Sequence, residues 1–372
     1  MPVSKLLILS NGYGEDAVGA EIARRLPKTM EIAAYPTLGP GRAYEGVCPI
    51  VGPRRELPSE GHRLRGSLIR DALAGFGIGP ALKFMRNEAK AYDAILVVGD
   101  MLGIVMCWWT GSRVRIYLDV YKSGYAHTYS ALERFLLRRS VDLVLNRDPI
   151  LAAQLQTAHI NARFAGSAMM DTVRPSNYSA NDRRRHAKAI AVLPGSRSSM
   201  ATNFTTQLAA LRQLPGIEGM DVFAVLARPG DAVDLADASG LNLTPPKANG
   251  GDLGILSDGR VTIYVSTGTL APVVGAVHVV LGQAGTANQQ AYGLGRPVVG
   301  FHAEGETPKR QSQDEAMAGD AAIFTPRDPA AMAAAIARLL ADEPDRLRRG
   351  AIGAEHMGPP GAIPAIIEEL TK

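Results

Sequence analysis

Short apolar runs separated by helix-length segments recur along this chain, and this alternation constrains its fold more than any other feature. In the first half the strand-like runs are 6–10, 31–35, 94–98, 114–118 and 141–146. The second half restarts the pattern at 189–193, 221–226, 261–265, 277–281, 297–301 and 321–324. Each half is therefore predicted to form a parallel sheet with helices on both faces.

Two domains are expected because the chain, at 372 residues, exceeds what one hydrophobic core usually supports. The segment 173–179 (VRPSNYS) and the charged run after it have the composition of a linker between the halves. The fold class is therefore predicted to be α/β, with two doubly wound, Rossmann-like domains. Ligands of such sheets bind beyond the carboxyl ends of the strands, so loops after strands are the candidate sites.

Composition excludes several classes of protein. Hydrophobic residues make up 46% and charged residues 20% of the chain, the balance of an ordinary globular protein. Cys48 and Cys107 are too few for a disulfide framework and lack metal-ligand spacing. No stretch reaches the roughly 18 apolar residues of a membrane-spanning helix. We therefore expect a cytoplasmic protein that is soluble or peripheral to a membrane. Its net charge of +4 is only mildly basic, and no nucleic-acid partner is expected.

The first candidate loop, Ser10–Asp16, follows the first strand-like run and opens a helix. Its two glycines allow a tight turn and close approach to a ligand. Glu15 and Asp16 would repel a phosphate, so the loop is predicted to face an acceptor or a sugar. A plain strand-to-helix turn, with acidic residues that favour the helix dipole, explains the same residues equally well. The acceptor-loop residues of this prediction are Asn11, Gly12 and Gly14.

Two loops of the second half have the features of a phosphate site. Gly195, Ser196 and Arg197 follow one predicted strand and offer backbone N–H groups, a hydroxyl and a guanidinium. Gly285 and Thr286 follow another strand and open a helix, with N–H groups and a further hydroxyl. Either loop alone is consistent with an ordinary turn. Together they favour a cradle for the diphosphate of a nucleotide.

In the first half of the chain, the buried run 94–98 is followed directly by Gly99 and Asp100. An aspartate in this position is either the N-cap of the following helix or a catalytic acid that points into the site. Glu15 and Asp16 are the other acids on a loop expected near the donor. The catalytic candidates are therefore Asp100, Glu15 and Asp16.

The stretch 62–86 interleaves basic and apolar residues. Its basic members are Arg63, Arg65, Arg70, Lys83 and Arg86, against Asp71 alone. This pattern predicts a surface that docks on anionic lipid headgroups. The alternative is an ordinary helix pair whose long basic side chains reach solvent. The segment 106–109 (MCWW) holds both tryptophans, which belong either to the core or to an apolar acceptor groove.

At these loops the chain resembles the lipid-A-disaccharide synthase family, most closely its uncharacterised synthase-related branch, nearly from end to end. Asn11–Asp16 stands where the family has Gly-Glu-x-Ser-Gly-Asp, and Gly99-Asp100 matches its strand-end aspartate. Gly166–Asp171 is similar to the hinge segment Gly-x-Pro-x-x-Asp. Leu193–Arg197 matches the donor loop, and Gly285–Ala287 matches the second donor loop.

The resemblance implies a GT-B fold, with two Rossmann-like domains that face a cleft. The first domain would cover 1–168 with a C-terminal helix at about 357–372, and the donor domain 169–356. It further implies an inverting, metal-independent glycosyltransferase, without a cofactor, that moves a sugar from a UDP-sugar to a lipid or glycolipid acceptor. Asp100 would be the base, and the protein would be peripheral on the inner face of the cytoplasmic membrane. The implied donor-binding residues are Gly195, Ser196, Arg197, Gly285, Thr286, Ala287, Gln289 and Gln290.

Three departures from the family pattern keep alternatives open. After Asp100 the chain reads Met101-Leu102-Gly103 and lacks the family's second acidic residue. Gln289 or Gln290 replaces the glutamate that would hold the donor ribose, and the opening loop is rearranged. The alternatives are a UDP-sugar 2-epimerase of the same fold and a non-catalytic nucleotide-sugar-binding protein.

Overall fold

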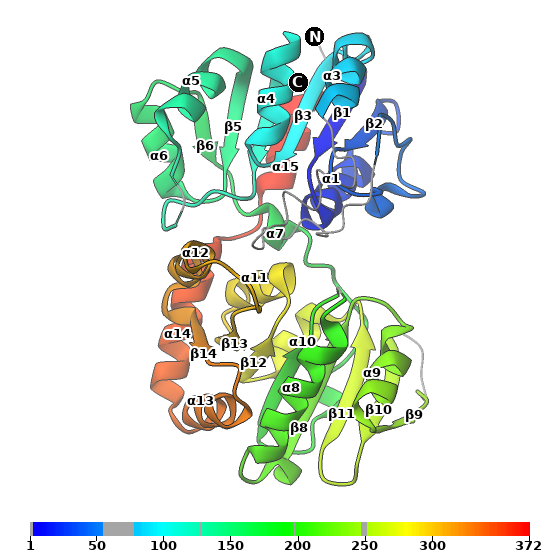
Figure 1. The fold of residues 1–372 in the computed structure, drawn as a ribbon, viewed down its shortest axis with the longest axis vertical. Helices are drawn as coiled ribbons and strands as arrows, with labels where there is room; N and C mark the ends of the chain where they lie inside the picture. The colour runs from blue at the N-terminus through cyan, green and yellow to red at the C-terminus, as the bar shows by residue number, and fades with distance from the viewer. Residues whose placement is uncertain (1–2, 55–77, 127, 197, 247–250) are drawn as a thin grey trace. The chain divides into compact units, whose positions relative to one another are not determined.

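The computed structural model describes residues 3–54, 78–126, 128–196, 198–246 and 251–372, which form two compact units (Figure 1). The first unit consists of Met1–Thr172, Gly305–Gln313 and Gly358–Lys372, and the second of Val173–Glu304 and Asp314–Met357. The first unit ends at Thr172 in this part of the chain, four residues after the predicted boundary at 168. In the part of the chain that the structure describes, no helix is long and apolar enough to cross a bilayer.

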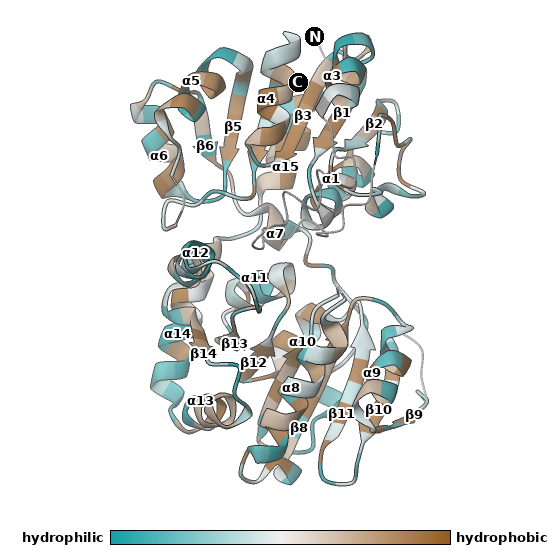
Figure 2. Ribbon diagram, viewed as in Figure 1, coloured by the Kyte–Doolittle hydropathy of each residue, from teal (hydrophilic) through white to brown (hydrophobic). Residues whose placement is uncertain are grey.

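The first unit contains a six-stranded parallel sheet between two layers of helices. Its strand order is β2 (Glu31–Pro36), β1 (Lys5–Ser10), β3 (Ala94–Gly99), β4 (Val114–Asp119), β5 (Val141–Asn146) and β6 (Ala162–Phe164). One face packs against α1 (Tyr13–Arg25), α7 (Ala168–Asp171) and α15 (Ala362–Thr371). The other face packs against α3 (Ile78–Asn87), α4 (Met101–Thr110), α5 (Ala131–Ser140) and α6 (Pro149–Thr157). Figure 2 shows the central strands β3 and β5 as hydrophobic along their length, as expected for strands covered on both faces.

Polar side chains cap the starts of three helices on one face of this sheet. Asp100 accepts a hydrogen bond from the Leu102 N–H and caps α4, and Asp148 accepts one from the Leu151 N–H and caps α6. Ser130 and Glu133 form a capping box at the start of α5. These caps satisfy N–H groups that the first helical turn leaves without partners.

The end of the chain completes the core of the first unit. The apolar side of α15 is buried there through Ala362, Ile363, Ile366 and Leu370. The carboxylate of Asp171 accepts hydrogen bonds from the N–H groups of Gly361 and Ile363, each at 2.8 Å. Asp171 belongs to the hinge segment recognised in the sequence, so that segment anchors a helix almost 200 residues away.

The second unit contains an eight-stranded sheet with the order β14-β13-β12-β7-β8-β11-β10-β9. The strands are β7 (Lys188–Leu193), β8 (Met220–Leu226), β9 (Asn242–Thr244), β10 (Asp252–Ser257), β11 (Thr262–Thr267), β12 (Val279–Gly282), β13 (Val298–Phe301) and β14 (Ala322–Thr325). Six strands are parallel, whereas β10 pairs antiparallel with both β11 and β9, an edge that the sequence pattern did not predict. The helices are α8 (Met200–Gln213), α9 (Asp231–Ser239), α10 (Leu270–Ala276), α11 (Gly285–Gly293), α12 (Pro308–Ala318, which continues from the first unit), α13 (Pro329–Ala341) and α14 (Glu343–Met357).

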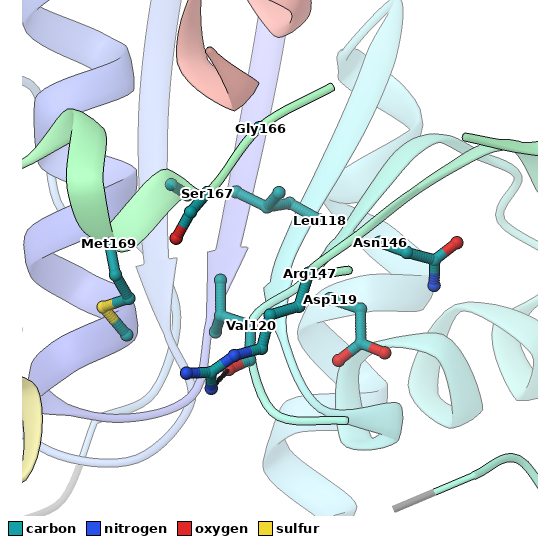
Figure 3. A pocket seen from close by; sticks show the side chains of 9 residues that line it. Leu118, Asp119, Val120, Asn146, Arg147, Gly166, Ser167 and Met169 are labelled. Carbon is teal, nitrogen blue, oxygen red and sulfur yellow. Dashed lines mark hydrogen bonds between the residues drawn. The ribbon is translucent and has the colours of Figure 1, made fainter. Parts of the chain in front are cut away.

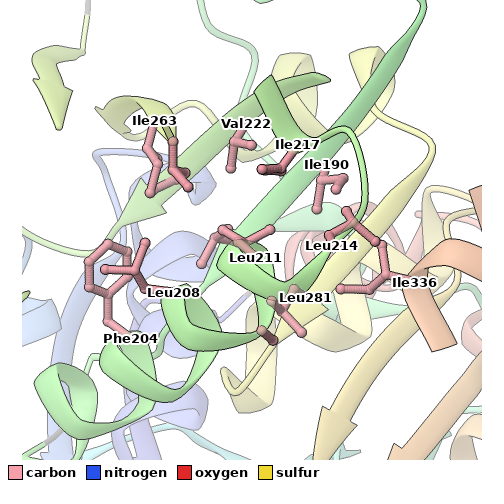
Figure 4. Packing of buried hydrophobic residues seen from close by; sticks show 14 of the residues in the cluster. Ile190, Phe204, Leu208, Leu211, Leu214, Ile217, Val222, Ile263, Leu281 and Ile336 are labelled. Carbon is pink, nitrogen blue, oxygen red and sulfur yellow. The ribbon is translucent and has the colours of Figure 1, made fainter. Parts of the chain in front are cut away.

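The larger core cluster of the second unit lies between its sheet and the helices α8, α9 and α13 (Figure 4). Phe204, Leu208 and Leu211 of α8 are fully or almost fully buried against Val222 and Leu281 of the strands. This packing fixes α8 on the sheet directly after the loop that ends β7. It therefore holds the first donor loop between two rigid elements.

The strand order defines one switch point in each sheet. In the first sheet, the connection from β1 leads to β2 on one side, and β3 lies on the other. In the second sheet, β7 is followed by β8 on one side, and β12 lies on the other. Loops at such a point leave the sheet in opposite directions and open a crevice beyond the carboxyl ends, where doubly wound proteins bind ligands.

Candidate functional site

The two predicted donor loops lie side by side at the switch point of the second sheet. Leu193, at the end of β7, is in register with Gly282, at the end of β12. The Gln283 N–H donates to the Leu193 carbonyl at 2.7 Å, so the bases of the two loops are hydrogen-bonded to each other. Gly195 has φ +98°, and a Cβ there would lie 3.2 Å from the Gln283 carbonyl oxygen. A glycine is therefore required where the loops meet.

These loops present the groups that a diphosphate needs. Gly285 begins α11, and no side chain among the described residues caps the start of this helix, so its first N–H groups are available to an anion. Ser196 and Gly285 are exposed, and Thr286 is half-buried. Arg197 lies outside the described residues. The donor role of these residues stays a prediction.

Three other predicted donor residues lie further along α11. Ala287 packs against the second core cluster of the unit, and Gln290 is almost fully buried. Gln289 is half-buried. Because Gln289 and Gln290 are consecutive residues of a helix, they point about 100° apart, and only one of them can face a given ligand.

In the first unit, the opening loop and Asp100 meet at the other switch point. The Oδ1 atom of Asn11 accepts the Asp100 N–H at 3.3 Å. Gly99 has φ +136°, and a Cβ there would lie 1.7 Å from that Asn11 oxygen and 3.3 Å from Cγ of Glu15. The absence of a side chain at Gly99 thus lets Asn11 and Glu15 pack beside Asp100. Gly12 ends this loop as the N-cap residue of α1, Gly14 lies in the first turn of that helix, and both are half-buried.

The carboxylate of Asp100 has the geometry of a helix cap. Its Oδ1 atom accepts the Leu102 N–H at 2.8 Å. The side chain is half-buried, and its second oxygen is not required by the cap. Capping and catalysis are therefore compatible at this position, and the catalytic role stays a prediction.

Asp16 is held in a buried hydrogen-bond network. The Ser10 hydroxyl donates to Oδ1 of Asp16 at 2.6 Å and lies 2.9 Å from the hydroxyl of Tyr44. Burial raises the pKa of Asp16 to about 7, and the nearby charge of Glu15 adds to the rise, while the Ser10 hydrogen bond opposes it. Tyr44 lies on a short 3₁₀ helix that no sequence pattern connects with this loop.

A second buried acid, Asp119, was not identified from the sequence. It ends β4, accepts the N–H groups of Tyr121 (3.0 Å) and Lys122 (2.9 Å), and accepts the hydroxyl of Tyr129. Burial raises its pKa to about 6. Asp119 follows an apolar run, as Asp100 does, so the same strand-end signal would have found it.

The network around Asp119 reaches the Asp100 turn. The buried hydroxyl of Tyr117 donates to the carbonyl oxygen of Gly99 at 3.2 Å. Tyr117 and Asp119 are two residues apart on β4, so their side chains lie on the same face of the sheet. The peptide group between Gly99 and Asp100 is thus held at both ends, because Asn11 accepts its N–H and Tyr117 donates to its carbonyl oxygen.

A small pocket, open to solvent, lies beyond the carboxyl ends of β4 and β5 (Figure 3). Its lining residues are Leu118, Asp119, Val120, Asn146, Arg147, Gly166, Ser167, Ala168 and Met169. Arg147 is buried and donates from Nη1 to the Val120 carbonyl at 3.2 Å. The pocket borders the hinge segment 166–171. It lies at the ends of β4 and β5 and is therefore separate from the switch point between β1 and β3. Among the described residues, no group of three or more His, Cys, Asp or Glu side chains is arranged to hold a metal ion.

The predicted membrane-docking residues are only partly within the described chain. Arg63, Arg65 and Arg70 lie outside it, whereas Lys83 and Arg86 are exposed on α3. The segment 106–109 divides between core and surface, because Met106 and Cys107 are buried and the two tryptophans are not. The exposed large hydrophobics of the neighbouring helices α4 and α5 are Trp108 (46%), Trp109 (59%), Leu132 (68%) and Phe135 (50%).

Comparisons with known sequences gave no match to a protein-family model and none to a curated protein. Solved structures gave matches over nearly the whole chain. The spinosyn rhamnosyltransferase SpnG complexed with thymidine diphosphate has a TM-score of 0.63 at 16% identity, over 98% of this chain and 100% of its own. MnaA of S. aureus, solved with UDP, has a TM-score of 0.61 at 14% identity, over 99% and 95%. The UDP-GlcNAc 2-epimerase from Neisseria meningitidis, bound to UDP-GlcNAc, has 0.58 at 13%, over 98% of each chain.

The chain has the GT-B fold. The predicted fold class, two Rossmann-like α/β domains, is therefore confirmed. Both glycosyltransferases and UDP-GlcNAc 2-epimerases are among these structural neighbours. At identities of 13–16% the likeness extends to the fold alone.

Proposed function

We propose that this GT-B protein is an inverting, metal-independent glycosyltransferase. It moves a sugar, N-acetylglucosamine or a similar hexose, from a UDP-sugar to a lipid-linked acceptor at a membrane surface. The observation that carries the proposal is the position of the predicted loops: in each unit, the two loops that the sequence singled out flank the switch point of the sheet. The sequence resemblance to the lipid-A-disaccharide synthase family supports a glycolipid acceptor.

The second unit binds the donor in this proposal. Its two hydrogen-bonded loops offer the N–H groups of an uncapped helix start and the hydroxyls of Ser196 and Thr286. Such fixed dipoles stabilise the negative charge that develops on a leaving UDP. Arg197 adds a guanidinium to the same loop in the sequence. These groups take the place of the metal ion that other glycosyltransferases use.

The first unit supplies the base. Asp100 is fixed by its own cap, by Asn11 and, through Gly99, by Tyr117, so its carboxylate has a defined position. It takes the proton of the acceptor hydroxyl while the sugar is transferred with inversion. Glu15, which packs beside Gly99, and the buried Asp16 are the reserve bases.

The membrane surface is contacted by α3, α4 and α5 of the first unit. These neighbouring helices carry the exposed Trp108 and Trp109 together with the exposed basic residues Lys83, Arg86 and Arg139. Tryptophan favours the interface between water and lipid, and basic side chains are attracted to anionic headgroups. The face therefore fits the surface of an anionic bilayer.

Incubation of the full chain with UDP-GlcNAc and a bacterial membrane-lipid extract tests the activity. Sugar transferred to lipid, seen by mass spectrometry, supports the proposal. Conversion of UDP-GlcNAc to its 2-epimer would instead establish the epimerase. Binding of UDP without either product would establish a non-catalytic nucleotide-sugar-binding protein.

The Asp100→Asn variant tests the mechanism. Asparagine keeps the cap but cannot take the proton, so kcat should fall by about 10²–10⁴-fold while UDP affinity and melting temperature stay near wild type. Asp148→Asn is the matched control, because Asp148 also caps a helix of the first unit, α6, shortly after the end of a strand of the same sheet. Near-normal turnover of Asp100→Asn would move the base to Glu15 or Asp16.

A further inference from the structure

Two side-chain amides on α8 contact the loops of the proposed donor site from behind. Asn203 and Gln207 are four residues apart and therefore lie on one side of the helix. The Nδ2 atom of Asn203 donates to the Pro194 carbonyl at 3.1 Å. The Nε2 atom of Gln207 donates to the Leu281 carbonyl at 3.0 Å and to the Leu193 carbonyl at 3.4 Å. Neither residue belongs to the predicted donor set.

Gln207 joins the ends of two strands. Leu193 ends β7, and Leu281 precedes the last residue of β12, so the amide bridges the two neighbouring strands immediately below their loops. The Leu193 carbonyl also accepts the Gln283 N–H at 2.7 Å. One carbonyl group thus connects both loops and α8, and the spacing of the loops depends on it.

Asn203 sets the direction of a peptide group in the first loop. In a planar trans peptide the C=O and the following N–H point in opposite directions. The Pro194 carbonyl points to Asn203 on α8, so the Gly195 N–H points away from this helix. A loop whose N–H groups face outward is the arrangement that binds phosphate.

The burial of Gln207 argues against a role in stability alone. The side chain has no exposed surface, and no described residue hydrogen-bonds its Oε1 atom. A buried acceptor without a partner lowers the stability of a fold, and an apolar side chain of similar length would avoid this loss. Stability alone therefore does not favour glutamine at this position, whereas the alignment of two ligand loops does.

We propose that Gln207 and Asn203 are positioning residues of the donor site, which hold both loops in the geometry that receives the diphosphate of a nucleotide. The proposal rests on the proposed function, because it assumes that these loops bind a nucleotide diphosphate. It predicts a separation of two quantities that a structural residue would change together: affinity for UDP and thermal stability.

Calorimetric titration of the full chain with UDP, combined with thermal melting, tests this separation. In Gln207→Met, the dissociation constant should rise about 3- to 10-fold, the scale of one or two net hydrogen bonds. The melting temperature should stay the same or rise. Asn203→Ala, at a half-buried position, should show a loss of affinity of similar size and provides the test if Gln207→Met fails to fold.

Leu211→Met is the matched control, because Leu211 is fully buried on α8 one turn further on and contacts the core rather than the loops. It should leave UDP affinity unchanged. Wild-type affinity in Gln207→Met, or a lower melting temperature without loss of affinity, would overturn the positioning role. A wild-type chain that does not bind millimolar UDP would contradict the donor assignment itself, and the positioning role with it.

Discussion

The carboxyl group of Asp16 lies between Ser10 and Tyr44, and burial raises its pKa from an ordinary value of 3.8 to about 7. Between these two values the folded protein keeps a proton that the unfolded chain has released. The free energy of unfolding therefore falls as the pH rises from about 4 to about 7. The contribution of Asp16 is fully present below about pH 4 and is lost above about pH 7.

The Asp16→Asn variant should remove much of this pH dependence, because the amide resembles the protonated acid. At pH 8 the variant should be more stable than wild type, by at most about 4 kcal/mol, and at pH 4 the two should be similar. Urea unfolding followed by tryptophan fluorescence reports on the first unit, which holds both tryptophans. Asp119, whose pKa is raised to about 6, leaves a smaller slope in the variant. An unchanged slope would contradict the buried network.

At the scale of single elements, α15 depends on a cap from a distant part of the chain. Asp171→Ala removes both acceptors for the N–H groups of Gly361 and Ile363, so the first unit should lose about 1–3 kcal/mol. Amide hydrogen exchange should increase in 361–371 in particular.

Asp328 provides the comparison for this variant, since it caps α13 of the second unit through the N–H groups of Ala330 and Ala331. Asp328→Ala should leave the tryptophan-detected unfolding of the first unit unchanged. Equal exchange rates in wild type and Asp171→Ala would show that the packing of α15 alone anchors it.

Strands that are buried on both faces were the easiest elements to predict. The predicted run 141–146 coincides with β5, because a strand covered on both faces reads as a continuous apolar segment. The antiparallel strand β10 was missed, since Asp252, Gly254 and Ser257 interrupt its apolar pattern, and a strand that is only partly buried requires no continuous apolar run. Pairing with β11 and β9, rather than local sequence, determines that strand.

Two features of the site were beyond sequence reasoning for physical reasons. Four consecutive apolar residues at 106–109 cover a full helical turn, so periodicity does not distinguish the buried Met106 and Cys107 from the exposed tryptophans. Gln207 contacts carbonyl groups that are 14 and 74 residues away in the chain. Such contacts exist only after the sheet has formed, and no local sequence motif predicts them.

At the scale of the whole molecule, the proposed attachment to lipid belongs to one unit. Trp108→Ser combined with Trp109→Ser should weaken binding to vesicles rich in phosphatidylglycerol by about 10-fold, because both exposed indoles leave the interface. Added salt should weaken the wild type as well. The control is Leu347→Ser, which removes an equally exposed apolar side chain from the second unit. Wild-type binding by the double variant in a sedimentation assay would exclude this face.

The anchoring of α15 in the first core has a consequence for synthesis. Residues 173–357 leave the ribosome between the main part of the first unit and its last helix. At the usual rates of translation, this delay lasts about 10–40 s. During that time the apolar groove that receives Ile363 and Ile366 faces water, and a newly made chain is open to chaperones and proteases there. The first unit is thus synthesised first but completes its hydrophobic core last.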